Sequence, residues 1–195
     1  MEILSNDYFE DQEFNNLSLI GEKLESKNFQ DCTFKNCDFS KSNFAHSVFA
    51  QCEFDSCNFS LVSLWETQLN GVVFNECKIL GINFTQMNDL VVRFDFENSF
   101  ISECDFSDLE IPKTKLINCE VKNCEFFQTN LSESDLSNSD FFNTVFEVTN
   151  LSKANLVGAI NYRINPLSNN IKNTRFSLPE AASMFEFLDI KIVDE

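Results

Sequence analysis

Large apolar residues recur at every fifth position over most of this chain, and this period constrains the fold more than any other feature. A first run holds 16 repeats without a miss, and after a slip of phase a second run holds 13 more. We call these residues the centres. The centres of the first run are Phe9, Phe14, Leu19, Leu24, Phe29, Phe34, Phe39, Phe44, Phe49, Phe54, Phe59, Leu64, Leu69, Phe74, Ile79 and Phe84. Those of the second run are Phe96, Ile101, Phe106, Ile111, Leu116, Val121, Phe126, Leu131, Leu136, Phe141, Phe146, Leu151 and Leu156.

A period of five fits neither an α-helix, whose apolar residues are three and four apart, nor a half-buried strand, in which they alternate. The position two residues before each centre is mostly small, and all eight Cys residues occupy it. Small side chains there and large ones at the centres let an interior interdigitate. The remaining positions of each repeat are mostly polar. The pattern predicts a solenoid in which each pentapeptide forms one short side of a coil.

Three segments show the repeat most clearly: Asp31–Lys35, Asn36–Ser40 and Lys153–Val157. They resemble pentapeptide repeats of the A(D/N)LXX type, and the resemblance covers roughly residues 7–160. It implies an all-β fold, a right-handed quadrilateral parallel β-helix with four repeats in each coil. Coils of that length would place residues 20 apart in sequence on top of one another. The expected ladders are Phe14, Phe34, Phe54 and Phe74, and Cys37, Cys57 and Cys77.

The period breaks once, over residues 85–95. Phe84 and Phe96 are twelve residues apart where ten would keep the phase, so about two residues are extra. One interpretation is a bulge or corner that offsets two parts of the same β-helix. The other is a protruding loop that contacts a partner through Met87, Asp89 and Arg93, because irregular segments on rigid scaffolds often carry contacts.

Residues 161–195 follow the repeats and are expected to cap the open end of the β-helix. Ser177–Glu180 has the pattern of a capping box with Pro in the first turn, which predicts a short α-helix to about Leu188. An alternating segment after it predicts a short strand over 190–192.

This tail, with Ile20–Glu25 and Tyr162–Pro166, resembles the Qnr and mycobacterial fluoroquinolone-resistance branch of the pentapeptide repeat proteins. The resemblance implies a homodimer joined end to end through the C-terminal helix. Its contacts would be Met184, Phe185, Leu188, Ile190 and Ile192. Many Qnr proteins carry two long loops, whereas here only the 85–95 segment interrupts the repeat.

The chain is strongly acidic, with 31 Asp and Glu against 14 Lys and Arg and a net charge of −17. Such a chain is not expected to bind nucleic acid or an anionic membrane, both of which need basic side chains. The charge provides solubility or fits a basic partner. The acids are dense over residues 95–147. The candidate partner-binding residues there are Glu103, Asp105, Asp108, Glu110, Glu120, Glu125, Glu133, Asp135 and Asp140.

The Qnr resemblance implies that these acids imitate the DNA backbone and bind DNA gyrase or topoisomerase IV, protecting the enzyme from quinolones or modulating it. Coils of 20 residues would bring Asp105 beside Glu125 and Glu120 beside Asp140. Two other functions stay open, which are a scaffold that binds another protein and an exported effector. Trp65, Phe127 and Phe142 each follow a centre directly and are candidates for apolar contacts of a scaffold.

Nothing in the sequence predicts catalysis. The Cys spacing follows the repeat and lacks the short gaps of zinc sites, and His46 is expected to point outward while the Cys residues point inward. Nucleotide-binding and nucleophile motifs are absent from the sequence. We therefore expect no enzyme activity, no catalytic or metal-binding residues and no cofactor. Without a signal-peptide pattern or an apolar stretch long enough to span a membrane, a cytoplasmic location and reduced thiols are expected.

Overall fold

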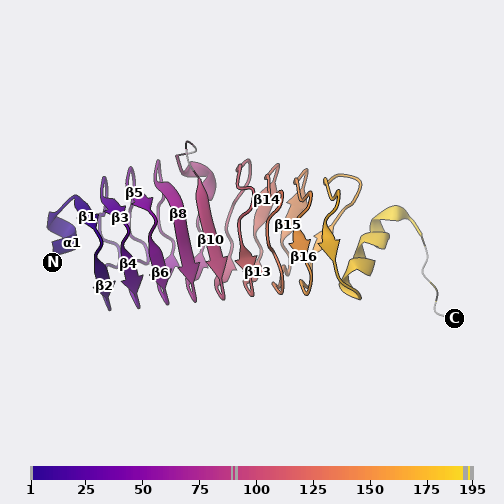
Figure 1. The fold of residues 1–195 in the computed structure, drawn as a ribbon, viewed down its shortest axis with the longest axis horizontal. Helices are drawn as coiled ribbons and strands as arrows, with labels where there is room; N and C mark the ends of the chain where they lie inside the picture. The colour runs from indigo at the N-terminus through magenta and orange to yellow at the C-terminus, as the bar shows by residue number, and fades with distance from the viewer. Residues whose placement is uncertain (1, 89, 91, 191–192, 194–195) are drawn as a thin grey trace.

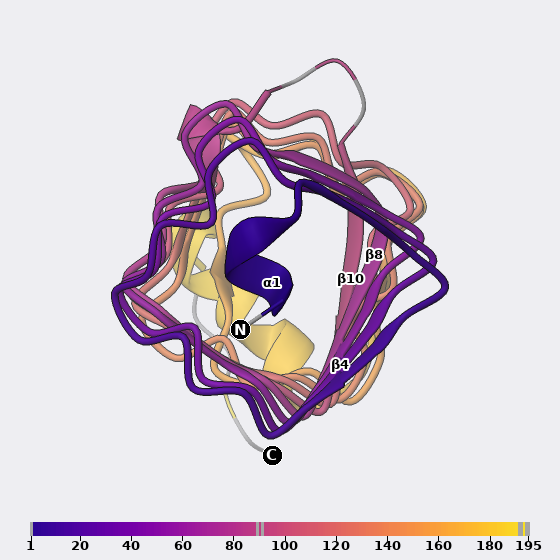
Figure 2. The same ribbon diagram turned by 90° about the vertical axis from the view of Figure 1, so that its left-hand side faces the viewer.

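The computed structural model describes residues 2–88, 90, 92–190 and 193. The chain forms a long rod of stacked parallel coils, a β-solenoid with the N-terminus at one end and the C-terminus at the other (Figure 1). Seen along its axis, the rod has a four-sided outline (Figure 2). The predicted pentapeptide-repeat β-helix with a short helix after it is confirmed.

The chain visits four faces in each coil, and we number them in that order. The first face holds β1 (Tyr8–Glu10), β3 (Asn28–Gln30), β5 (Val48–Ala50) and the start of β8 (Gln68–Asn75). The second face holds β2 (Glu13–Asn15), β4 (Thr33–Lys35), β6 (Glu53–Asp55), the end of β8, β10 (Arg93–Glu97), β12 (Leu116–Ile117), β16 (Asn155–Leu156) and β18 (Arg175–Phe176). The third face holds β7 (Asn58–Ser60), β9 (Lys78–Leu80), β11 (Phe100–Ser102) and β13 (Glu120–Lys122). The fourth face holds β14 (Glu125–Phe127), β15 (Val145–Glu147) and β17 (Arg163–Ile164).

The register between coils follows the repeat. Phe9 pairs with Phe29, 20 residues later. After the phase break the offset is 22, because Phe74 pairs with Phe96 and Ile79 with Ile101. The two extra residues inferred from the sequence are therefore present, and the ladders continue across them without a change of face.

The break itself lies at the corner between the fourth and first faces, after the 3₁₀ helix η1 (Phe84–Gln86). Leu90 is 79% exposed there, whereas Met87 is only 7% exposed. The expectation that Met87 contacts a partner is wrong, because its side chain packs into the core. Arg93 is exposed at the start of β10. Asp89 lies outside the described residues.

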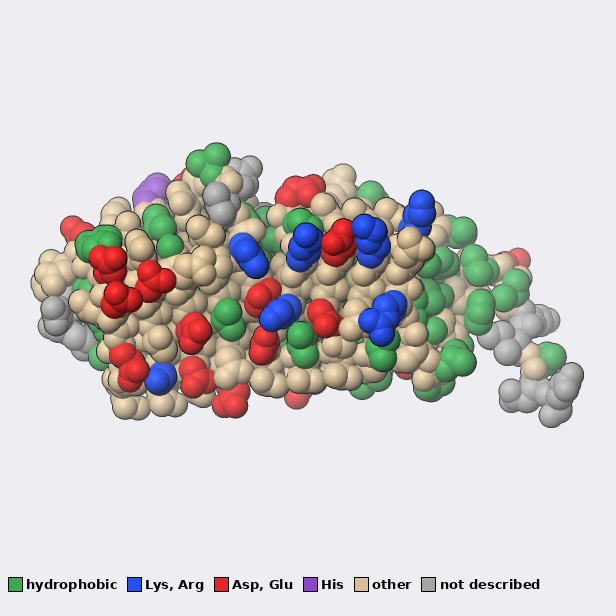
Figure 3. Space-filling model, viewed as in Figure 1, with side chains coloured by type: hydrophobic (Ala, Val, Ile, Leu, Met, Phe, Trp, Pro, Cys, Tyr) green, Lys and Arg blue, Asp and Glu red, His purple; other side chains and the backbone are tan. Residues whose placement is uncertain are grey.

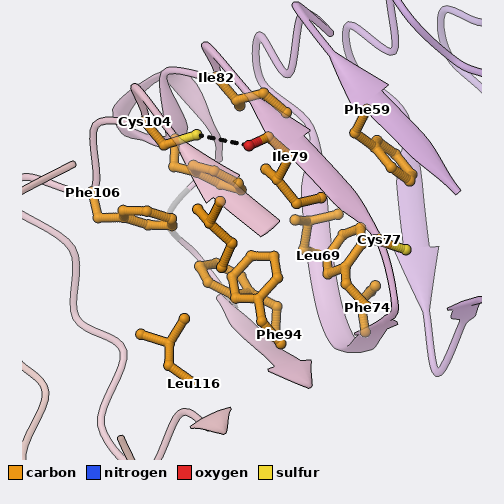
Figure 4. Packing of buried hydrophobic residues seen from close by; sticks show 14 of the residues in the cluster. Phe59, Leu69, Phe74, Cys77, Ile79, Ile82, Phe94, Cys104, Phe106 and Leu116 are labelled. Carbon is orange, nitrogen blue, oxygen red and sulfur yellow. Dashed lines mark hydrogen bonds between the residues drawn. The ribbon is translucent and has the colours of Figure 1, made fainter. Parts of the chain in front are cut away.

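Phe ladders fill the interior, as the resemblance to pentapeptide repeats implies. On the second face the rings of Phe34 and Phe54 stack with centroids 4.7 Å apart, and those of Phe54 and Phe74 with centroids 5.2 Å apart. The ladder crosses the phase break, since Phe74 and Phe96 stack at 5.0 Å. The close-up in Figure 4 shows the large apolar side chains around this break packed against one another. The rings of adjacent faces meet edge to face, an arrangement that favours aromatic pairs.

The small residue two positions before each centre has a second role besides leaving room for the large side chains of the core. Its hydroxyl or thiol donates a hydrogen bond to the carbonyl of a centre in the preceding coil. Thr67 Oγ1 lies 2.8 Å from the Phe44 carbonyl, and Cys57 Sγ lies 3.4 Å from that of Phe34. Ser, Thr and Cys suit this position because each is small and supplies a donor. The predicted ladder of Cys37, Cys57 and Cys77 is confirmed, with backbone N to Sγ distances of 3.4 Å between successive members.

Each corner of the coil lies two residues after a centre, where the backbone enters the left-handed region. Asn36 has φ 52° and Asn118 has φ 55°. Asn, Asp and Gly tolerate this conformation best, which explains why they are frequent at the corners. Gly81, with φ 65°, occupies such a corner, and a Cβ there would lie 2.7 Å from Cδ2 of Leu61 in the neighbouring coil.

A single helical turn caps the N-terminal end. Helix α1 (Glu2–Ser5) lies within the four-sided outline of the coils (Figure 2), and its Ile3 is buried. The buried Lys27 ammonium donates to the Asn6 carbonyl at 2.7 Å and to Asp7 Oδ1 at 2.8 Å. These bonds fix the segment that follows the helix, so the first coil does not leave its core open.

The C-terminal end differs from the sequence prediction in four ways. The ladder extends beyond residue 160, because β17 pairs with β15 and β18 with β16, as far as Phe176. The helix that follows, η2 (Glu180–Leu188), ends where predicted but is a 3₁₀ helix rather than an α-helix. Ile190 belongs to no strand, and the rest of the predicted strand falls largely outside the described residues.

The predicted capping box is also wrong. Ser177 Oγ accepts a hydrogen bond from the Gly158 amide at 2.9 Å, and Glu180 Oε1 accepts one from the Asn161 amide at 2.5 Å. Both side chains therefore satisfy donors of the preceding coil instead of donors at the start of η2. They attach the helix to the rod.

Truncating one ring of the second-face ladder should destabilise the rod strongly. Phe54→Ala removes a ring that is 1% exposed and stacks on two others, which should cost about 3 to 5 kcal/mol in the free energy of unfolding. Urea unfolding followed by circular dichroism measures this. Phe127→Ala removes a ring that is 41% exposed and is the matched control, with an expected change within about 0.5 kcal/mol. Equal effects of the two substitutions would contradict the ladder as the main source of stability.

Candidate protein-interaction surface

The nine candidate acids do not share one face of the rod. Glu120 and Asp140 lie on the third face, Asp105 and Glu125 on the fourth, Glu110 on the first and Asp135 on the second. Glu103, Asp108 and Glu133 occupy three different corners, with φ between 55° and 62°. The two predicted stacks are confirmed, since Asp105 bridges to Glu125 and Glu120 to Asp140 in adjacent coils. The sequence placed these residues outward correctly but did not show how they divide among the faces.

Basic side chains compensate the acids on the first and second faces. Glu133 lies between Lys153, whose Nζ is 3.0 Å from its carboxylate, and Lys113 at 3.9 Å. The hydrogen bond from Lys153 and the charges of both lysines lower the pKa of Glu133. Lys115 and Glu97 pair at 3.5 Å on the second face. Figure 3 shows Lys and Arg side chains gathered over the C-terminal half of this side of the rod, while Asp and Glu cluster over its N-terminal half.

Other candidate acids are held by amide side chains. Nδ2 of Asn130 lies 2.7 Å from Glu110, that of Asn155 lies 2.9 Å from Asp135, and that of Asn161 lies 2.7 Å from Asp140. Each of these Asn residues belongs to the coil after its acid. On the third face, Glu120 pairs with Lys122 at 2.7 Å.

Of the four remaining acids, Asp108 lies at the corner between the fourth and first faces, and the other three lie beside a groove at the corner between the third and fourth faces. We call it the acidic groove, a hollow of about 470 Å³ lined by Glu103, Asp105, Asn123, Glu125, Asn143 and Val145, with Gly81 at one end. Among the described residues, the carboxylates of Glu103 and Glu125 have no hydrogen-bond or ion-pair partner, and that of Asp105 accepts only the Ser107 amide at 2.9 Å. Three candidate carboxylates without a basic partner among the described residues thus meet here.

Sequence reasoning missed the groove, although it named its three acids. The groove depends on neighbours from several coils, such as Asn123 and Asn143, whose side chains bond to each other at 2.8 Å. Its one local signal is Gly81, which leaves the corner without a side chain. The exposed aromatic residues were anticipated correctly, with Trp65, Phe127 and Phe142 between 41% and 57% exposed.

The Cys side chains point away from solvent, and their thiols donate hydrogen bonds to backbone carbonyls of the preceding coil. All eight Cys residues are free and buried. Burial raises the pKa of Cys52 to about 12 and that of Cys119 to about 11. His46 is exposed at a corner with φ 60°, on the outside of the coil. Within the described part of the chain, no group of three or more His, Cys, Asp or Glu is placed to hold a metal ion.

Comparison with known families agrees with the repeat. A model of the pentapeptide repeat region matches residues 27–103, and a model of eight pentapeptide repeats matches residues 124–160. The chain belongs to the pentapeptide repeat family. Together the two matches cover more than half of this repeat protein. No curated protein matches its sequence.

Solved structures of two trypsin-treated variants of QnrB1, a plasmid-mediated fluoroquinolone resistance protein, are similar to this pentapeptide repeat protein. One has a TM-score of 0.72 over 95% of this chain and 100% of its own, and the other has 0.73 over 95% and 97%. Both are 18% identical in sequence. At that identity the likeness establishes the shared fold. In the described residues, no helix has the length and apolar character needed to cross a membrane.

The thiols should be unreactive in the folded protein and should make it sensitive to alkali. Because the folded pKa of Cys52 is raised from 9.0 to about 12, its stabilising contribution is complete below pH 9 and is lost as the pH rises toward 12. Iodoacetamide at pH 8 should label the native thiols far more slowly than those in urea. Cys52→Ser keeps a small donor without titrating, so it should flatten the fall of the urea midpoint between pH 9 and 11. Rapid labelling of the native chain would contradict this account.

Proposed function

We propose that this protein is a non-enzymatic acidic rod that binds a type II topoisomerase, DNA gyrase or topoisomerase IV, in the place of DNA. The observation that carries the proposal is the division of charge between the faces. Carboxylates pair along the third face, at Glu120 and Asp140, and along the fourth, at Asp105 and Glu125. Among the described residues only Glu120 of these four has a basic partner, Lys122, whereas two lysines flank Glu133 between the first and second faces. In the C-terminal half of the rod, one side thus carries carboxylates suited to a basic surface, and the opposite side carries lysines that offset its acids. In the cytoplasm, the expected location, it would meet such an enzyme.

The geometry supports a partial imitation of the duplex. In a parallel ladder, the backbones of paired residues such as Asp105 and Glu125 lie about 4.8 Å apart, whereas successive phosphates of one DNA strand rise about 3.4 Å along the axis. The rod therefore offers a lower density of charge than DNA, and over a short row, because Asn83 and Val145 occupy the neighbouring positions of the same column. Binding would rest on charge complementarity, which speeds association and weakens as salt screens it.

The fold adds support to quinolone protection in particular. QnrB1, whose structures share this fold, is described as a fluoroquinolone resistance protein. We propose that this chain acts in the same way, by occupying the topoisomerase and protecting it from quinolones or modulating it. This rod differs from the many Qnr proteins that carry two long loops, because the interruption after η1 adds only two residues to a coil.

A homodimer is part of the proposal. None of the residues of η2 is buried, although the helix contains Phe185 and Leu188, which are 41% and 39% exposed, and Ile190 follows at 53%. Hydrophobic side chains gather at the C-terminal end of the rod in Figure 3. A second copy docked end to end would cover them. Met184 is half-buried and would contribute at the edge, and Ile192 lies outside the described residues.

The native protein should restore supercoiling by DNA gyrase in the presence of ciprofloxacin. Reversing three third- and fourth-face charges, with Glu120→Lys, Glu125→Lys and Asp140→Lys, should weaken this effect by at least about tenfold, equivalent to about 1.4 kcal/mol. The matched control reverses Glu110, Glu133 and Asp135 to Lys, which changes the net charge of the protein by the same amount but on the first and second faces. This control should retain most of the activity. If the native protein neither rescues nor inhibits gyrase at micromolar concentration, the proposed function is wrong.

Disrupting the exposed side of η2 should give a monomer. Phe185→Asp with Leu188→Asp places two charges where apolar surface would be buried, and sedimentation velocity should show the dimer dissociating at concentrations at least about tenfold higher than for the native chain. Phe127→Asp, on the fourth face, is the control and should leave the dimer intact. A native chain that sediments as a monomer at all concentrations would contradict the dimer.

A scaffold that binds another protein is the second candidate. It is favoured by exposed apolar side chains in the N-terminal half and at the phase break, where Leu61 is 54%, Trp65 52% and Leu90 79% exposed. A scaffold of that kind would lose binding with Trp65→Ala and would keep it with the three charge reversals of the third and fourth faces. The topoisomerase proposal requires the opposite result.

A further inference from the structure

Charges of both signs are separated along one strip of the rod, at the corner between the first and second faces. The strip consists of three columns, which are the residues directly after the first-face centres, those at the corner and those directly before the second-face centres. The last column shows nine successive rungs, with Glu13 in the first, Asp95 in the fifth and Arg175 in the ninth. We call these three columns the charged strip.

The first part of the charged strip is acidic and the last part is mainly basic. Among the described residues, its first four rungs hold five acids and no base. The acids are Glu10, Asp11, Glu13, Asp31 and Glu53. The other five rungs hold six bases against three acids. The bases are Arg93, Lys113, Lys115, Lys153, Lys172 and Arg175. Figure 3 shows the two signs apart, with red side chains over the N-terminal part of this side and a row of blue ones over the C-terminal part.

The charges at the two ends of the strip are little compensated within their own chain. Among the described residues, the side chains of Lys172 and Arg175 make no ion pair, and neither does that of Asp31. The Glu10 carboxylate accepts only the hydroxyl of Tyr8, at 2.9 Å. Both ends are therefore available to opposite charges from outside the chain.

A second copy laid antiparallel against the strip places each end over its complement. A twofold axis that crosses the strip at the rung of Asp95 keeps every residue in its own column and exchanges the first rung with the ninth. Glu10 then faces Lys172, and one rung further in Asp31 faces Lys153. Each contact forms twice, because the same surface of both copies takes part.

The middle of the strip fits the same arrangement. At the axis, Arg93 and Asp95 lie two residues apart with opposite charges, so each can pair with the other residue of the second copy. One like pair arises, between Glu53 and Asp135. Lys115 lies one rung from that pair on each copy and offsets it.

The net charge of the chain does not prevent this contact. The strip itself is nearly balanced, with eight acids and six bases, although the whole chain carries −17. The stacked acids of the third and fourth faces lie across the core of the rod. Packed sheets are about 10 Å apart, which exceeds the Debye length of about 8 Å at physiological salt.

The size of the strip indicates a weak contact. Eight strand spacings make it about 38 Å long, and three residues of extended chain make it about 10 Å wide. Its outline is then about 400 Å² on each copy, at the low end of specific interfaces. Ion pairs at such a surface are each worth less than about 1 kcal/mol and weaken in salt.

We propose that the charged strip binds a second copy of this chain in antiparallel orientation, as a weak twofold dimer held by ion pairs. This goes beyond the proposed function, because it uses neither η2 nor the acids of the third and fourth faces. With the charged strip turned inward, both copies keep those acids on the outside. The lateral pair is therefore acidic on both of its outer sides.

Zero-length cross-linking of the native chain tests the orientation directly. A carbodiimide joins a lysine to a carboxylate only where the two touch. Glu10 and Lys172 are eight strand spacings, about 38 Å, apart within one chain, so a bond between them forms only between copies. Mass spectrometry of the cross-linked dimer should find this bond. Lys122 and Glu120, 2.7 Å apart in one chain, are the positive control.

A charge swap measured by sedimentation velocity tests the pairing. The full chain carries Phe185→Asp and Leu188→Asp, so that end-to-end association does not contribute. Glu10→Lys alone and Lys172→Glu alone should each raise the dissociation constant at least about tenfold, because each dimer contains the pair twice. The two together should restore it. Glu22→Lys, on the fourth face of the first coil, changes the net charge as Glu10→Lys does and should shift it less than about twofold.

Several outcomes would overturn the proposal. A double variant that associates no better than the single ones would disprove the pairing, and an equal loss with Glu22→Lys would mean a general effect of charge. Absence of the bond between Glu10 and Lys172, with the control bond present, would disprove the orientation. A chain that stays monomeric at millimolar concentration in 50 mM salt would exclude a second copy as the occupant. Circular dichroism confirms that each variant is folded. The swap assay lacks both a working η2 contact and a topoisomerase, so its failure leaves the end-to-end dimer and the gyrase proposal untouched.

Discussion

The whole structure depends on the in-register stacking of each coil on the one before it. A coil of four pentapeptides buries one large side chain per face, and that side chain contacts its equivalents above and below. The Phe rings of the second face, with centroids 4.7 to 5.2 Å apart, show the contact directly. The backbone pairs at the same spacing, so ring stacking and ladder hydrogen bonds support one register. Neither could change phase without breaking the other.

This constraint leaves the outward positions free to carry function. A substitution on the surface changes no core contact, so each face can acquire its own chemistry. The rod uses that freedom unevenly. Lysines beside Glu133 compensate one side, whereas Glu103 and Glu125 remain uncompensated on the other. Like charges one strand spacing apart repel each other, and the stability of the ladders is sufficient to hold them in place.

The fold could be predicted closely because its signal is local and repeated. A period of five with small residues two before each centre requires the same geometry many times, so errors at one repeat are corrected by the others. The same count predicted the two extra residues before Phe96. The ends were predicted less well, because they do not repeat. Ser177 and Glu180 match a capping box locally, yet their oxygens bond to Gly158 and Asn161 in the preceding coil. A pattern read within one segment cannot show such competing partners.

The sequence by itself determined the repeat and which side chains point inward or outward, because these follow from the order of residues within each pentapeptide. The length of the coil, and with it the interior ladders, came from the resemblance to pentapeptide repeat proteins. Only the tertiary structure decided which outward residues are neighbours. Coiling brings residues 20 or 22 apart in sequence to within one strand spacing, and it sets Glu103 at a corner beside Asp105 and Glu125 while Glu133 falls among lysines. The charge of −17 is a property of the sequence. The acidic groove around Glu103, Asp105 and Glu125 is a property of the stacked coils.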